Sequence, residues 1–254
     1  MTQDNATGWV KIAGLGPGDE SMVTAQVQDI LAEASDIVGY IPYVKRIPVR
    51  PGLTLHATDN RVEIERATHA LEMAARGKRV VVVSSGDPGV FAMASAVFEA
   101  LELADRPEWL DLDIQVLPGI TAMLAASARI GAPMGHDFAA INLSDNLKPW
   151  SLIEKRLRLA GEAGFAMGFY NPRSKSRPHQ FGRALEILRE ACGGETLISF
   201  ARDVSKPGES ITTVTLDDAR PEMADMRTVV IVGNSDTRRI GPHVYTPRHA
   251  RNSD

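Results

Sequence analysis

Short apolar runs alternate with amphipathic segments along the first half of the chain. Runs short enough for strands lie at residues 10–15, 36–40, 79–83 and 114–117. Segments with helical character lie between them, at residues 25–34, 61–76, 91–104 and 121–130. The second of these carries apolar residues at helical spacing, at 67, 70, 71 and 74. The run Val80–Val83 is continuous and β-branched, which is typical of a parallel strand buried on both faces. This alternation predicts an α/β fold with a parallel sheet.

The pattern changes near Gly131–Gly135, where we expect a boundary between an N-terminal α/β domain (1–131) and a C-terminal α/β domain (132–254). Strands are expected at 138–143, 165–170, 196–200, 211–215 and 228–232, and helices at 150–160 and 179–192. Only a short polar segment separates the last two strands, which favours a mixed sheet. The tail after Ile240 is polar and contains proline, so we expect it to be frayed.

Composition narrows the functional classes. The chain has 254 residues, of which 44% are hydrophobic and 24% charged, as expected for one large or two ordinary globular domains. Its single cysteine, Cys192, excludes an internal disulfide and a cysteine-rich metal cluster held by one chain, so we expect no metal site and a cytoplasmic location. No signal peptide or membrane span is expected. A net charge of −4 argues against a nucleic-acid surface.

Three glycine-containing turns follow three of the expected strands, at 14–18, 86–89 and 118–119. In a parallel sheet these turns meet at one edge, where they could line a crevice for a nucleotide-like ligand. Glycine at such a turn lets a ligand approach the backbone closely. The first turn departs from the dinucleotide fingerprint G-x-G-x-x-G, because Asp19 replaces the third glycine and Pro17 interrupts the turn. An ordinary strand-to-helix turn, with Thr24 capping the next helix, is the alternative.

Two polar residues beside these turns have two interpretations each. The carboxylate of Asp87 could accept hydrogen bonds from an amine or hydroxyl of a ligand, or it could serve only as a turn or helix-capping residue. Thr121 could contact the same ligand or cap the helix that follows it. The residues alone favour the structural interpretation for Asp87 and leave that of Thr121 open.

Three motifs, GLGPGD at 14–19, SSGDPGVF at 84–91 and PGITA at 118–122, resemble those of the tetrapyrrole methylase family, in the same order. The resemblance implies two α/β domains with S-adenosylmethionine bound in the cleft between them. Further segments resemble the members of this family that methylate precorrin-3B at C17 in cobalamin biosynthesis: GYIPYV at 39–44, GHDFAAINLSD at 135–145, FYNPRSKSR at 169–177, ARDVSKPGE at 201–209 and TVVIVGNS at 228–235. Together these segments cover the chain from about residue 9 to residue 240.

The resemblance also implies roles for individual residues. Those expected to bind the cofactor are Pro17, Ser85, Gly86, Asp87, Val90, Thr121, Ala122, Asn171, Arg202 and Asp203. The implied reaction is methylation at C17 with contraction of the macrocycle to precorrin-4, leaving S-adenosylhomocysteine. The cofactor and the macrocycle supply the reacting groups, so the protein mainly positions them and excludes water.

Ring contraction requires proton transfer, for which His136, Asp145, Tyr43 and Asp87 are candidates. The alternatives are a residue at the domain junction for His136, a turn residue for Asp145 and a packed aromatic for Tyr43. Precorrins carry many carboxylates, and arginine binds carboxylates through two parallel hydrogen bonds. Arg173, Lys175 and Arg177, with Arg46 and Arg50 as weaker candidates, are therefore expected to bind substrate, the alternative being a solvated charged loop.

Three other functions remain open at this stage. The chain could methylate a different precorrin carbon, or it could bind a tetrapyrrole or S-adenosylmethionine without catalysis. A nicotinamide-dependent oxidoreductase is disfavoured by the missing third glycine at Asp19 and by Pro17. The family resemblance also suggests a homodimer.

Overall fold

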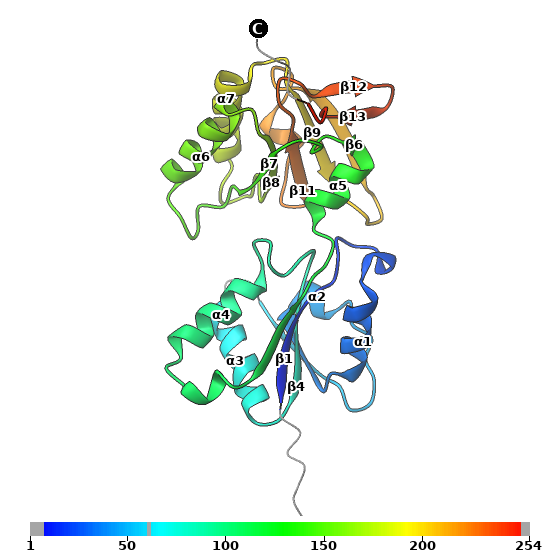
Figure 1. Cartoon of the computed structure of the whole chain (residues 1–254), viewed down its shortest axis with the longest axis vertical. Coiled ribbons are helices and arrows are strands. Elements are labelled where there is room, and N and C mark those ends of the chain that lie inside the picture. The colour runs from blue at the N-terminus through cyan, green and yellow to red at the C-terminus, as the bar shows by residue number, and fades with distance from the viewer. Residues whose placement is uncertain (1–7, 60–61, 250–254) are drawn as a thin grey trace, which may run out of the picture. The chain divides into compact units, whose positions relative to one another are not determined.

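The computed structural model describes residues 8–59 and 62–249 of the chain. The chain divides into two compact units, Met1–Thr121 and Ala122–Asp254 (Figure 1). This division lies one helix ahead of the boundary expected at residues 131/132. The helix in question, α5 (Ala122–Ile130), buries Met123 and Ala126 in the same cluster as Val229 and Ile231 of the second unit. Its apolar face therefore packs with the later part of the chain.

The first unit contains one five-stranded sheet in the order β3-β2-β4-β1-β5. Its strands are β1 (Trp9–Gly14), β2 (Asp36–Tyr40), β3 (Thr54–Thr58), β4 (Arg79–Ser84) and β5 (Asp113–Leu117). All neighbouring strands are parallel, which confirms the predicted parallel sheet. Only β3 was missed by the sequence prediction. It lies at the edge of the sheet, is half-exposed, and reads Thr-Leu-His-Ala-Thr, so it lacks a continuous apolar run.

The helices of the first unit lie on both faces of this sheet (Figure 1). They are α1 (Ala25–Glu33), α2 (Ile41–Val44), α3 (Glu63–Ala75) and α4 (Met93–Leu103), with short 3₁₀ turns η1 (Glu20–Met22) and η2 (Pro107–Trp109). The expected start of α3 at Arg61 lies outside the described residues. Val80 and Val82 pack with α3 and α4, whereas Val81 and Val83 face the opposite cluster. Because both faces are covered, every residue of this run is buried, as its composition predicted. Thr24 caps α1 as expected, its Oγ1 accepting a hydrogen bond from the backbone N–H of Val27.

The second unit is built on a mixed sheet, as predicted, in the order β10-β9-β11-β8-β7. The strands are β7 (Phe138–Asn142), β8 (Ala166–Tyr170), β9 (Leu197–Arg202), β10 (Ser210–Thr215) and β11 (Thr228–Val232). β7 and β8 are parallel, and the other neighbouring pairs are antiparallel. Helices α6 (Trp150–Glu162) and α7 (Gln180–Cys192) cover one face and α5 covers the other (Figure 1). A 3₁₀ turn, η3 (Pro221–Met223), precedes β11.

The C-terminal segment is ordered beyond Ile240, so the expectation of a frayed tail is wrong for this part of it. Strands β12 (Arg238–Ile240) and β13 (His243–Tyr245) form a small sheet with β6 (Gly131–Ala132). Val244 is 3% exposed and lies in the cluster formed by α5 and β11. Thr246 is buried, and its N–H donates a hydrogen bond to the carbonyl of Ala132 at 2.9 Å. One apolar side chain and the pairing with β6 therefore hold a segment whose composition is polar.

This packing predicts the effect of shortening Val244. Val244→Ala removes two methyl groups from a buried site, so we expect it to lower the free energy of unfolding by about 1–3 kcal/mol. Val49→Ala is the control, because Val49 is 81% exposed and its truncation should change stability by less than about 0.5 kcal/mol. Urea denaturation of both variants measures the difference. Equal effects of the two substitutions would contradict the packing of the tail.

Candidate functional site

Three turns meet at the carboxyl edge of the first sheet, as the sequence predicted. β4, β1 and β5 are neighbours, so the segments that follow Gly14, Ser84 and Leu117 emerge side by side. Gly16 and Gly86 form an antiparallel bridge: the N–H of Gly86 donates to the carbonyl of Gly16 at 2.9 Å, and the reverse bond measures 3.2 Å. The first two turns are thus joined through their backbones.

The third turn packs against the other two without space for side chains. A Cβ atom on Gly14 would lie 2.6 Å from the carbonyl oxygen of Gly86 and 2.8 Å from the Cα of Gly119. A Cβ on Gly119 would lie 2.3 Å from the same oxygen of Gly86. These glycines let the three turns approach one another. That is a different role from the close approach of a ligand that the sequence suggested.

Asp87 cross-links two of these turns. Its Oδ1 accepts a hydrogen bond from the N–H of Gly89 at 2.8 Å, and its Oδ2 accepts one from the N–H of Gly119 at 3.0 Å. It does not cap α4, whose N-cap residue is Ala92. A carboxylate has about four acceptor positions, so Asp87 retains capacity for an amine or hydroxyl of a ligand. The structural and the ligand-binding interpretations of this residue are therefore compatible.

The other first-unit residues expected to bind the cofactor surround the same edge. Pro17 and Thr121 are buried, and Ser85 and Val90 are half-buried. The next residue, Phe91, ends the motif at 84–91 but was not among the residues expected to bind the cofactor. Its φ of 53° is unusual for a bulky side chain, and its side chain is 48% exposed. Backbone strain of this kind is frequent at functional sites. The sequence around Phe91 gives no signal of this conformation.

The second-unit residues expected to bind the cofactor gather at one edge of the mixed sheet. β11 pairs with both β8 and β9, and its register aligns Phe169 with Val230 and Phe200. The ends of β8 and β9, where Asn171 and Arg202 lie, therefore point in the same direction. Asn171 has a φ of 52°, a left-handed conformation that asparagine tolerates. Ala122 begins α5, whose next residue, Met123, donates its N–H to the hydroxyl of Tyr170 at 3.0 Å.

Arg202 and Asp203 are engaged in ion pairs that join the end of β9 to the segment just before β11. The carboxylate of Asp203 is 2% exposed and contacts Arg202 Nη1 at 2.8 Å and Arg227 Nε at 2.6 Å. Arg202 also binds Asp225 at 2.9 Å. These contacts stabilise the loop after β9 and leave its role toward a cofactor as a prediction.

The candidates for proton transfer are separated within the second unit. His136 precedes β7 and Asp145 follows it, so the length of a five-residue strand, roughly 16 Å, lies between them. Asp145 is held by Gln180 at 3.2 Å and lies 3.8 Å from Arg177. His136 lies 3.8 Å from the carboxylate of Asp137. The structure therefore does not bring His136 and Asp145 to one end of the sheet.

Tyr43 lies on α2 in the first unit. Burial raises the pKa of its phenol above the ordinary value of 10.0, and Tyr40 adds to this effect while Arg66 and Arg46 oppose it. The phenol is therefore protonated at neutral pH. Tyr43 can therefore donate a hydrogen bond, whereas its raised pKa makes the phenol a weaker acid and the protonated phenol unsuited to act as a base.

The basic residues differ in availability. Arg177 is 7% exposed, and its Nη1 donates to the carbonyls of Leu143 at 3.1 Å and Asn171 at 3.2 Å, so it holds the ends of β7 and β8 together. Arg46 donates to carbonyls of the first glycine turn. Arg173 is half-buried and Lys175 is exposed. Arg173 Nε donates to the carbonyl of Pro178 at 3.4 Å, and Lys175 is the most accessible of the four.

Lys148 is a further cation that the sequence analysis did not single out. Its Nζ donates to the carbonyl of Ser144 at 3.1 Å, in the loop after β7. Burial lowers its pKa below the ordinary value of 10.5; Arg156 and Arg177 lower it further, and Asp145 opposes them. Lys148 thus belongs to a group of positive charges at the carboxyl ends of β7 and β8. Its isolated position in a polar loop gave no sequence signal.

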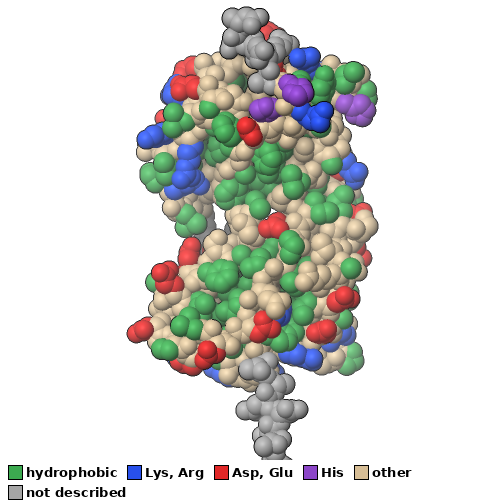
Figure 2. Space-filling model, viewed as in Figure 1, with side chains coloured by type: hydrophobic (Ala, Val, Ile, Leu, Met, Phe, Trp, Pro, Cys, Tyr) green, Lys and Arg blue, Asp and Glu red, His purple; other side chains and the backbone are tan. Residues whose placement is uncertain are grey.

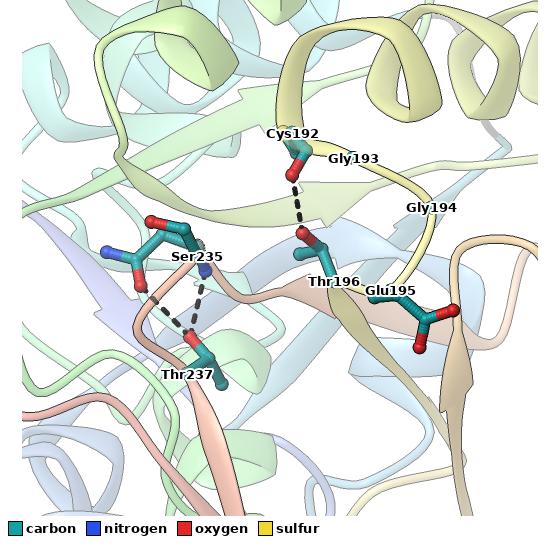
Figure 3. Close-up of a pocket in the computed structure, with 8 residues that line it drawn as sticks. Cys192, Gly193, Gly194, Glu195, Thr196, Ser235 and Thr237 are labelled. Carbon is teal, nitrogen blue, oxygen red and sulfur yellow. Dashed lines mark hydrogen bonds between the residues drawn. The ribbon is translucent and has the colours of Figure 1, made fainter.

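A separate pocket lies at the opposite edge of the second sheet, where β9 begins and β11 ends (Figure 3). It is lined by Cys192, Gly193, Gly194, Glu195, Thr196, Asn234, Ser235 and Thr237. Burial raises the pKa of the Cys192 thiol to about 11, so the thiol is protonated and a poor nucleophile at neutral pH. Thr196 donates its hydroxyl to the carbonyl of Cys192 at 2.7 Å. This pocket carries none of the residues expected to act on a substrate.

Comparison with known proteins assigns the fold and these motifs to a family. Residues 10–220 match the family model of Tetrapyrrole (Corrin/Porphyrin) Methylases. The chain belongs to this family. A precorrin-3B C(17)-methyltransferase from a Sinorhizobium species is 47% identical, covering 95% of this chain and 97% of that protein. A probable cobalt-factor III C(17)-methyltransferase from Salmonella typhimurium is 38% identical, covering 94% of this chain and 98% of that protein.

Solved structures agree with this assignment. A crystal structure of the methyltransferase CobJ is 71% identical, with a TM-score of 0.92, covering 94% of this tetrapyrrole methylase and all of that chain. A uroporphyrin-III C-methyltransferase from Thermus thermophilus, complexed with S-adenosylhomocysteine, shares the fold at 22% identity and a TM-score of 0.68, covering 89% of this chain and 97% of that one. The family predicted from the three glycine motifs is therefore confirmed. No helix in the described part of this methylase is long and apolar enough to cross a membrane.

The geometry around Asp87 predicts the effect of removing its carboxylate. Asp87→Ala leaves the N–H groups of Gly89 and Gly119 without this acceptor, which should cost about 1–3 kcal/mol of stability. Asp87→Asn keeps one acceptor oxygen and should lose less. Thermal unfolding of the two variants measures the difference, and an unchanged melting temperature in Asp87→Ala would contradict the cross-link.

Proposed function

We propose that this tetrapyrrole methylase transfers a methyl group from S-adenosylmethionine to C17 of precorrin-3B, with ring contraction to precorrin-4, in cobalamin biosynthesis. The observation that carries the proposal is the similarity to the Sinorhizobium C(17)-methyltransferase over nearly the full length of both proteins. The high identity to CobJ supports the same assignment. Methylation of another precorrin carbon, or binding without catalysis, would leave this full-length similarity unexplained.

S-adenosylmethionine is the methyl donor in this proposal, and S-adenosylhomocysteine is the product. The residues proposed to bind it are Pro17, Ser85, Gly86, Asp87, Val90, Thr121 and Ala122, together with Asn171, Arg202 and Asp203. Asp87 fits a cofactor that carries hydroxyl and ammonium groups, because its carboxylate has acceptor positions left beyond its two backbone bonds. The complex of the Thermus thermophilus relative with S-adenosylhomocysteine supports this choice.

The proposed methyl transfer is a displacement in which a C–C bond forms at C17 and the S–CH₃ bond breaks. The macrocycle supplies the electron pair, so the protein is required to align the two reactants and exclude water. Ring contraction adds proton transfers. Tyr43 stays a candidate as a hydrogen-bond donor, because burial raises the pKa of its phenol and keeps the phenol protonated. We retain His136 and Asp145 as further candidates, in separate roles because β7 lies between them.

Substrate binding is proposed for the basic residues of the second unit. Acidic residues outnumber basic ones in residues 1–121, whereas basic residues outnumber acidic ones in residues 122–254. Figure 2 shows both kinds of charge on the surface. An anionic macrocycle would therefore be attracted to the second unit. Arg173 and Lys175 lie in the segment after β8 that also holds Arg177, and the exposure of Lys175 supports a carboxylate-binding role for this segment.

We also propose that the enzyme acts in the cytoplasm as a homodimer. The single cysteine is consistent with a reducing compartment. β5 is an edge strand with Val116 and the following Ile120 each 38% exposed, which suits association with another surface.

The test is incubation of the purified protein with precorrin-3B and S-adenosylmethionine carrying a ¹³C-labelled methyl group, followed by NMR of the product. A labelled methyl at C17 in a contracted ring is expected. A methyl at another carbon would assign the protein to a different reaction of the family. Cobalt-factor III is the control substrate, because the Salmonella typhimurium relative is named for it. Preferential turnover of cobalt-factor III would identify it, instead of precorrin-3B, as the substrate.

The assignment of Arg173 and Lys175 predicts a selective defect. Replacing both by Gln should raise the KM for precorrin-3B about tenfold or more, because two charge-assisted contacts to carboxylates are lost. The dissociation constant for S-adenosylhomocysteine should stay unchanged. Lys155→Gln, an exposed cation on α6, is the control. An equal loss of affinity for both ligands in the double variant would contradict the substrate role.

A further inference from the structure

Arg46 binds three carbonyl groups of one short loop. Its Nη2 donates to Leu15 O at 2.7 Å and to Gly18 O at 3.2 Å, and its Nη1 donates to Gly16 O at 3.5 Å. The acceptors all lie in the turn after β1, residues 15–18, whereas Arg46 follows helix α2. One side chain thus joins two segments that the sequence singled out as separate motifs.

The two ends of this loop are held in different ways. Its start is fixed to β4, because the N–H of Leu15 donates to Ser84 O at 2.8 Å and Gly16 pairs with Gly86. Pro17 has no N–H to donate, so the chain loses a backbone anchor at this point. The next residue, Gly18, is held to Arg46 through its carbonyl. The far half of the loop therefore depends on the guanidinium.

The charge of Arg46 is directed into the protein. The side chain is half-buried; burial lowers the pKa of its guanidinium, and Glu20 and Tyr43 oppose this effect. An arginine stays protonated at neutral pH, and its planar fork suits several acceptors in fixed directions. A substrate carboxylate would have to compete with the three carbonyls. This arrangement differs from that of Lys175, whose side chain is exposed.

We propose that Arg46 is a positioning residue that holds the loop 15–18 in the conformation that binds S-adenosylmethionine. This inference rests on the proposed function, because it takes this loop as part of the cofactor site. It replaces the direct contact with substrate that the sequence suggested for Arg46. The role is indirect, since Arg46 acts through the backbone of the loop.

The test is calorimetric titration of S-adenosylhomocysteine into the full-length protein and into Arg46→Met. Methionine preserves most of the aliphatic volume and removes every donor. We expect the dissociation constant to rise about tenfold or more, as for the loss of hydrogen bonds from a charged group. Arg189→Met is the matched control, because Arg189 donates through Nε to Leu216 O and through Nη2 to Ala219 O, both at 2.9 Å, within the second unit. Its dissociation constant should equal that of the wild type.

A conservative variant separates positioning from general destabilisation. Arg46→Lys keeps the charge but loses the planar fork, so its dissociation constant should lie between those of the wild type and Arg46→Met. This variant also serves as the test if Arg46→Met does not fold. Steady-state kinetics on the same proteins should show a raised KM for S-adenosylmethionine and a nearly unchanged KM for precorrin-3B.

The other outcomes each have a distinct meaning. Equal binding by the wild type and the Arg46 variants would overturn the positioning role and leave the proposed function intact. A raised KM for precorrin-3B alone would overturn it in favour of direct substrate binding. Absence of S-adenosylhomocysteine binding to the wild type would overturn the proposed function and, with it, the cofactor role of Arg46.

Discussion

The mutual contact of three backbone turns is the constraint on which the first unit depends. Gly14, Gly86 and Gly119 approach so closely that a methyl group on Gly14 or Gly119 would overlap a backbone atom. Asp87 then joins two of the turns by accepting hydrogen bonds from both. This contact fixes the carboxyl ends of β4, β1 and β5 relative to one another. It thereby positions the segments that follow these three strands.

In the second unit, charged side chains instead of glycines hold the ends of the strands in place. The buried guanidinium of Arg177 binds carbonyls at the ends of β7 and β8, and the buried carboxylate of Asp203 pairs with Arg202 and Arg227 after β9. A buried ion pair is weak evidence for added stability, because desolvation offsets much of the attraction. Its geometric effect is clearer, since the buried carboxylate of Asp203 joins Arg202 at the end of β9 to Arg227 just before β11. These residues define where Asn171 and the loop after β9 lie.

Arginine and aspartate side chains at these sheet edges can therefore either bind a ligand or hold the protein's own loops. Arginine was expected to bind the carboxylates of the macrocycle, and the family resemblance implied that Asp87 and Asp203 bind the cofactor. In the structure, Arg46, Arg177 and Asp203 direct most of their donors and acceptors to the protein itself. Lys175, by contrast, is exposed in the segment after β8, and its binding of a substrate carboxylate is part of the proposal. Methyl transfer requires the protein chiefly to hold its binding segments in fixed positions before the reactants bind.

Local periodicity and the glycine motifs were enough to determine much of this protein. The valine run of β4 predicted a strand buried on both faces, because such a strand is apolar at every position. The alternation of strand and helix segments predicted the parallel sheet. The motifs at 14–19, 84–91 and 118–122 identified the family. Only the tertiary structure decided what isolated residues do: Val244 anchors a polar tail, α5 packs on the second unit, Lys148 joins a charged group and Arg46 holds a loop. Each of these roles depends on contacts with residues that are distant in the sequence. The identity of one residue does not reveal which distant residues will contact it in the folded chain.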